Sequence, residues 1–191
     1  RSEAEEPEDA IFSVAEELAV TACLLPGAAQ DRTAWELWVK MRSERAIIQA
    51  RSMPEAVHDK GRTLAHFHAA EQLCERVTQR FRSLRVLRAW ATALFRHASV
   101  LIDEERAQAE VLLRRSWELL HDALEMDSEP SSQFYNSMGD TADMLAQTQL
   151  DAERMDQWFV LAMRKYETAR ALDVENGPII NNIALSYHNH A

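Results

Sequence analysis

The chain has 191 residues, of which 47% are apolar and 27% are charged, with only 4 glycines and 5 prolines. This is the composition of a globular protein with one domain or two small ones, and it excludes collagen-like, mucin-like and linker sequences. Four glycines are too few for the many tight turns of an all-β protein. We therefore expect a helical chain with few and short connections.

The net charge of −10 is distributed unevenly along the sequence. Residues 97–191 carry 17 acidic and 7 basic residues, whereas residues 1–96 carry 14 of each. Five acidic residues fall within residues 1–9, and six arginines fall within residues 76–96 without an acid among them. An acidic protein repels phosphate backbones, which disfavours nucleic acid as the main partner. The arginine segment keeps RNA as an alternative.

The cysteines and the hydropathy bear on the environment of the chain. Cys23 and Cys74 have neither CxxC nor Cys/His spacing, so we expect no disulfide framework, no zinc site and a reducing intracellular compartment, either cytoplasm or an organelle interior. The longest apolar runs fall far short of a membrane span, and we expect no membrane insertion. Because the sequence begins at Arg1, we expect a fragment or a processed chain.

In chain order, the first expected elements are a tail and three helices. Residues 1–9 lack large apolar side chains and predict an acidic flexible tail. Residues 10–83 predict an N-terminal helical region, for which a degenerate repeat is one interpretation. The first expected helix runs from Ile11 to the Pro26-Gly27 break, and the second from a capping box at residues 33–36 to Arg51. The third begins at a start signal in residues 52–55 and continues through Phe81, and we expect Gly61 to interrupt or kink it.

The rest of the chain, residues 84–191, predicts nearly continuous helix. The expected helices cover residues 84–101, 104–126, 132–148, 152–172 and 178–190. Start signals stand at most of the joints, since Ser131, Asp151 and Asn176 can each cap a helix with a side-chain oxygen. No strand pattern competes with these helices.

An internal repeat with a period of 45–46 residues runs through this region. On the second helices, Ser116, Leu120 and Ala123 match residues 162, 166 and 169 at a spacing of 46. On the first helices, the matches at a spacing of 45 are Trp90, Ala93, Leu94 and His97, then Tyr135, Met138, Gly139 and Ala142, then Ile180, Ile183, Ala184 and Tyr187. We refer to these first-helix residues as the repeat positions.

Two of these patterns resemble a known family. The run Ile180-x2-Ile183-Ala184-x2-Tyr187 resembles the first helix of a tetratricopeptide repeat, and Ala162-x3-Tyr166-x2-Ala169-x2-Leu172-Asp173 resembles its second helix. The resemblance implies an all-α, right-handed α-solenoid of antiparallel helix pairs. The period of 45–46 exceeds the usual 34, and Ser128 and Val174 stand where proline is common. HEAT and armadillo repeats, which have the longer period, are the alternative fold.

The resemblance also implies a concave groove, lined by the first helices, that binds peptides or another subunit. The residues expected on that partner groove are Arg88, Phe95, Asn136, Asp140, Asp143, Asn181 and His188. A lysine clamp for terminal carboxylates is not expected, because all three lysines lie outside these helices. Asp140 and Asp143 instead suggest a basic ligand, such as a basic targeting peptide, and the simpler interpretation is that both carboxylates face water.

The arginine segment admits two interpretations. The basic patch comprises Arg76, Arg80, Arg82, Arg85, Arg88 and Arg96, with Phe81, Trp90 and Phe95 interleaved. Arginines and aromatic rings together can hold single-stranded RNA, as in a ribonucleoprotein component. A solvated arginine-rich face is the simpler interpretation, because Trp90 and Phe95 also fit the helical packing pattern.

No catalytic, metal-binding or cofactor-binding pattern is recognised. His66 and His68 are two residues apart and so lie on different sides of a helix, which argues against a metal site between them. The terminal helix at residues 178–190 lacks the second helix of its pair, so we expect it to be covered by further chain or by a partner. The sequence therefore predicts a non-catalytic scaffold or adaptor subunit that binds other protein subunits or peptides.

Overall fold

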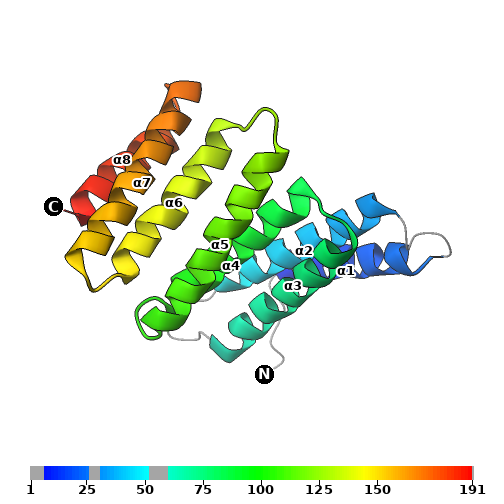
Figure 1. The fold of residues 1–191 in the computed structure, drawn as a ribbon. Coiled ribbons are helices and arrows are strands. Elements are labelled where there is room, and N and C mark those ends of the chain that lie inside the picture. The colour runs from blue at the N-terminus through cyan, green and yellow to red at the C-terminus, as the bar shows by residue number, and fades with distance from the viewer. Residues whose placement is uncertain (1–6, 26–30, 52–59, 191) are drawn as a thin grey trace. The chain divides into compact units, whose positions relative to one another are not determined.

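The computed structural model describes residues 7–25, 31–51 and 60–190. These residues form α-helices and no strand, which confirms the all-α prediction (Figure 1). The helices are α1 (Pro7–Leu24), α2 (Arg32–Arg51), α3 (Lys60–Arg80), α4 (Leu84–Leu101), α5 (Arg106–Met126), α6 (Ser132–Thr148), α7 (Ala152–Leu172) and α8 (Gly177–Asn189). Within the described ranges, none of them is both long enough and apolar enough to cross a lipid bilayer.

Helix boundaries follow the sequence signals closely in the second half of the chain. Ser131, Asp151 and Asn176 each accept a hydrogen bond from the backbone N–H three residues further on, as expected of N-caps. The helix expected from residue 104 begins at Arg106 instead. The reason is that the backbone N–H groups of Glu104 and Glu105 both donate to the carbonyl of Leu101, which forms a turn there.

The first half differs more from the sequence analysis. Helix α1 begins at Pro7, so residues 7–9 of the expected tail are helical. Gly61 is the second residue of α3, and the run expected before it lies outside the described residues, so the expected interruption there stays a prediction. The Pro26-Gly27 break and the start signal at residues 52–55 lie outside the described residues.

The chain divides into two compact units, residues 1–97 and residues 98–191, with the division inside α4. In unit 1, α2 packs against both α1 and α3. Glu16 on α1 is buried and accepts hydrogen bonds from Arg42 and Arg45 on α2, so a paired carboxylate joins these two helices. A buried charge is tolerated only when it is paired in this way.

Glu36 connects α2 to the beginning of α4 within unit 1. Its carboxylate accepts hydrogen bonds from Arg32, at 2.7 Å, and from the buried Ser83 hydroxyl, and it lies 3.6 Å from the Arg85 guanidinium. Burial alone would raise the pKa of Glu36, but the hydrogen bonds from Ser83 and Arg32 outweigh it and hold the pKa below its ordinary value.

This lowered pKa predicts a pH-dependent contribution to stability. The ionised Glu36 stabilises the fold above the pKa of an unfolded glutamic acid, about 4.3. The contribution is lost as the pH falls through the lower pKa of the folded state. Chemical denaturation of the wild type and Glu36→Gln should therefore give a difference in unfolding free energy that is largest above about pH 5 and shrinks in acid. The exposed Glu175→Gln is the control, and a Glu36→Gln difference that does not vary with pH would contradict the prediction.

In unit 2, α6 packs against both α5 and α7, and α8 lies against α7 and α6 (Figure 1). Helices α6 and α7 pack closely at Gly139, which lies against the ring of Tyr166. Tyr166, Ala142, Ala162 and Met163 are buried together there, with Trp158 among the half-buried residues packed around them. The small residues let the helices approach, and the aromatic rings fill the remaining space.

Glycine at position 139 is required by this packing. A Cβ atom there would overlap the Tyr166 ring, whereas a Cβ atom at Gly177 would meet nothing. We expect Gly139→Ala to lower the unfolding free energy by about 1–3 kcal/mol, despite the better helix propensity of alanine. Gly177→Ala should stay within about 0.5 kcal/mol of the wild type. Urea denaturation of both variants measures this, and equal stability of the two would argue against the close α6–α7 contact.

Candidate partner-binding site

The repeat positions differ in exposure from helix to helix. On α4, Trp90, Ala93, Leu94 and His97 are all buried, and on α6 Met138, Gly139 and Ala142 are buried while Tyr135 is half-buried. On α8, Ile180 is 49% exposed and Tyr187 is 56% exposed. Ala184 is exposed as well, and Ile183 is half-buried. The repeat positions that are mostly buried on α6 are therefore largely exposed on α8.

The cause is that α8 is covered on one side only. Ile179 and Ser186 are buried on the side of α8 that faces the rest of unit 2. On α6 the repeat positions are closed by α7, where Tyr166 covers Gly139. The equivalent of Gly139 on α8 is Ala184, and none of the described residues covers it.

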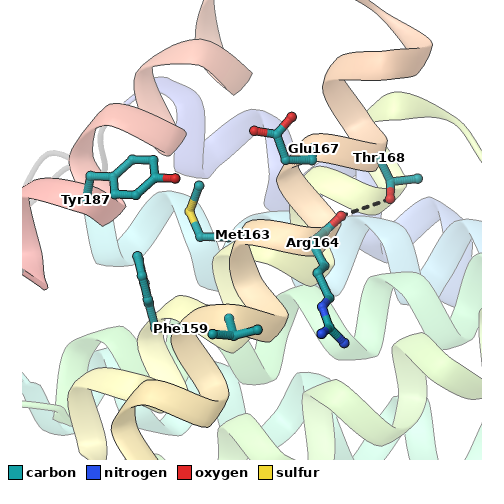
Figure 2. Close-up of a pocket in the computed structure, with 7 residues that line it drawn as sticks. Phe159, Met163, Arg164, Glu167, Thr168 and Tyr187 are labelled. Carbon is teal, nitrogen blue, oxygen red and sulfur yellow. Dashed lines mark hydrogen bonds between the residues drawn. The ribbon is translucent and has the colours of Figure 1, made fainter.

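A groove runs between α7 and this open side of α8. It has a volume of about 530 Å³ and is lined by Phe159, Val160, Met163, Arg164, Glu167, Thr168 and Tyr187. The rings of Phe159 and Tyr187 meet edge to face, with 5.8 Å between their centroids and 74° between their planes. Figure 2 shows both rings beside the Met163 thioether, so the floor of the groove is apolar.

The rim of the groove is polar. Glu167 pairs with Arg170 on the same helix at 2.7 Å, and the Thr168 hydroxyl donates to the backbone carbonyl of Arg164. The Arg164 and Glu167 side chains point away from each other along α7 (Figure 2). An apolar floor with a rim of both charge signs is typical of a surface that binds protein.

A polar network joins α6 to α7 and α8 beneath this surface. Asp140, on α6, accepts hydrogen bonds from the Tyr166 hydroxyl and from the Asn182 amide, each at 2.9 Å, and from Asn136 at 3.2 Å. Asn182 also donates to Asn136, 46 residues before it. Burial, together with the nearby charge of Asp140, raises the pKa of the Tyr166 hydroxyl, which therefore remains a donor at neutral pH.

Asp143 is the second carboxylate in this network, and it is buried. It accepts hydrogen bonds from the Ser186 hydroxyl and from Gln147, and it lies 3.5 Å from Nε2 of His190. The bonded positions on α6 and α8 increase together, from 136 with 182 to 143 with 186, so the two helices run in the same direction.

The residues expected on the partner groove differ in their surroundings. Asn136, Asp140 and Asp143 come together, but their polar groups are bonded to α7 and α8. Asn181 and His188 are exposed on α8. Arg88 and Phe95 are half-buried on α4 and belong to unit 1.

The six arginines of the basic patch all lie in unit 1 but on different elements. Arg76 and Arg80 are on α3, Arg82 is in the connection that follows, and the other three, Arg85, Arg88 and Arg96, are on α4. Two of them contact α2, since the Arg80 guanidinium lies 5.4 Å from the ring centroid of Trp35 and Arg85 lies beside Glu36. Arg96 lies over the ring of Phe95.

The sequence analysis missed several residues of the site. Phe159, Met163 and Glu167 line the groove from α7, but they occupy positions that the repeat comparison did not include. Asn182 could have been found from the sequence, because it stands one repeat period, 46 residues, after its hydrogen-bond partner Asn136. Comparison of the chain with family models, with curated proteins and with solved structures gave no match in any of the three.

The buried Asp143 carboxylate makes the α6–α8 contact sensitive to the loss of one donor. Ser186→Ala removes the hydroxyl that donates to it. We expect a loss of about 1–3 kcal/mol in the free energy of unfolding, because a buried acceptor loses a partner. Ser137→Ala is the matched control, since the Ser137 hydroxyl donates to the Gln133 carbonyl of its own helix, at 3.0 Å. Equal effects of the two substitutions in denaturant titrations would contradict this prediction.

Proposed function

We propose that the chain is a non-catalytic scaffold subunit that binds an amphipathic helix of another protein on α8. In this proposal, residues 98–191 form part of a right-handed solenoid of antiparallel pairs similar to tetratricopeptide repeats. One observation carries the proposal. Ala184 and Tyr187 are exposed although the matching Gly139 and Ala142 are buried on α6, and Ile180 is exposed where the matching Tyr135 is half-buried.

The repeat specifies what the bound helix has to supply. On α6, the side chain that covers the small residue Gly139 is the aromatic ring of Tyr166. By the same correspondence, Ala184 accepts a large or aromatic side chain of the partner helix. Apolar residues three and four positions away on that helix then lie over Ile180 and Tyr187. This is the helix-in-groove mode of recognition.

The energetics favour such coverage. Fully burying one large apolar side chain contributes about 1.5–3 kcal/mol. Ile180, Ile183 and Tyr187 contribute together, and the groove residues Phe159 and Val160 extend the same apolar surface. Burial of this size offsets part of the entropy lost on association. The charged rim then selects among partners, since Arg164 and Glu167 can pair with opposite charges.

A receptor for basic peptides is less well supported than helix docking. Such a peptide would have to reach Asp140 and Asp143, whose carboxylates already accept hydrogen bonds from Tyr166, Asn182 and Ser186. A ligand there would have to replace these bonds. The open face of α8 needs no such rearrangement.

Site-specific photocrosslinking in cells tests the docking face directly. A photoreactive residue at position 184 should crosslink to one recurring protein, and mass spectrometry should place the crosslink on a helix with apolar residues at intervals of three and four. A photoreactive residue at Val111, an exposed position on α5, is the control. Crosslinks that are the same at both positions, or none at position 184, would contradict the proposal.

Substitution of the exposed apolar face gives the quantitative test. We expect Ile180→Asp and Tyr187→Asp each to weaken binding of the crosslinked partner at least about tenfold, the equivalent of 1.4 kcal/mol. Neither should unfold the chain, because both side chains are about half exposed. Val111→Asp, at a position 66% exposed on α5, is the matched control and should keep full affinity. If the double variant Asp140→Asn, Asp143→Asn weakens binding while Ile180→Asp and Tyr187→Asp do not, the ligand is a basic peptide and helix docking on α8 is wrong.

A further inference from the structure

Two imidazoles and a carboxylate converge in unit 1, where α3 meets α4. His68 and Glu71 lie three residues apart on one side of α3, and His97 reaches them from α4. Each of the three offers a ligand atom, and all of these atoms lie within 4.8 Å of one another. The sequence alone did not predict this cluster, because His97 is 26 residues from Glu71.

Glu71 lies between the two imidazoles. Its Oε1 is 2.6 Å from Nδ1 of His97, and its Oε2 is 3.9 Å from Nδ1 of His68. Donor atoms that bind one Zn²⁺ ion at 2.0–2.2 Å in tetrahedral geometry are about 3.4 Å apart. The two observed separations lie on either side of that value, so binding of an ion would require the Glu71 carboxylate to move away from His97 and toward His68.

The surroundings of His97 also favour a ligand. Its side chain is 1% exposed, although the same repeat position holds the apolar Ala142 on α6. Phe67 stacks on the imidazole with 3° between the ring planes, which fixes its orientation. Placing an imidazole in the core is costly unless its polar atoms have a use.

Access to the cluster comes through His68. Its side chain is 54% exposed, whereas that of Glu71 is 19% exposed. The cluster therefore has one buried ligand, one partly buried ligand and one ligand at the surface. Two histidines and one glutamate are a common ligand set for zinc and for other first-row transition metals, and three protein ligands leave a position for water.

We propose that His68, Glu71 and His97 form a binding site for one divalent transition metal ion, represented by Zn²⁺. The bound ion joins α3 to α4 and stabilises unit 1. This inference is independent of the helix-docking proposal, because every ligand lies within residues 1–97.

Zinc titration of the full chain, purified without a polyhistidine tag, tests the site. Calorimetry should find one Zn²⁺ ion per chain with a Kd below about 10 μM, and saturating Zn²⁺ should raise the Tm, because a ligand that binds only the folded state stabilises it. His68→Ala and Glu71→Gln should each weaken the affinity at least about tenfold and reduce the rise in Tm at the same Zn²⁺ concentration. Both are chosen over a change of the buried His97, which would test folding as well as binding.

His66→Ala is the matched control, since His66 lies on the same helix outside the cluster. It should bind Zn²⁺ as tightly as the wild type. Zinc binding that is unchanged in both His68→Ala and Glu71→Gln would overturn the proposal. Binding only at millimolar Zn²⁺, or an equal loss in the His66→Ala control, would also overturn it.

Discussion

The requirement that a helix pair must hide its apolar side governs the second unit. Gly139 and Tyr166 meet that requirement for α6 and α7, because the absence of a side chain at position 139 lets the aromatic ring close over α6. The polar network of Asp140 and Asp143 then attaches α8 to the same surface. What remains is the outer side of α8, where Tyr187 and its neighbours have no equivalent cover among the described residues.

Polar bonds and apolar packing have different roles in this unit. Burial of Ala142, Ala162 and Met163 supplies the nonspecific driving force. The hydrogen bonds from Asn182 and Ser186 to the α6 carboxylates set the register, because a one-turn shift of α8 would leave buried polar atoms without partners. A firmly placed α8 presents its open side in a defined orientation, and a pre-organised surface loses less entropy when it binds.

The positions of the helices could be predicted from the sequence because the signals that begin and end a helix are local. Asp151 and Asn176 are caps whose partners lie three residues away, and the helices that follow begin where those signals place them. The groove and the histidine cluster could not be predicted in this way, because each is formed by residues from different helices. Glu71 and His97, 26 residues apart, become neighbours only through the packing of α3 and α4. The exposure of Tyr187 is likewise set by which helices cover α8 and not by its own sequence pattern.

Amide hydrogen exchange on the full chain, free and in its native complex, tests the central claim most directly. The account predicts that exchange in α8 and along the groove side of α7 slows at least about tenfold in the complex, because a docked helix suppresses local opening. Exchange in α2, within unit 1, should not change. Protection confined to α3 and α4, which carry the basic patch, would contradict the account if α8 exchanged equally in the free chain and in the complex.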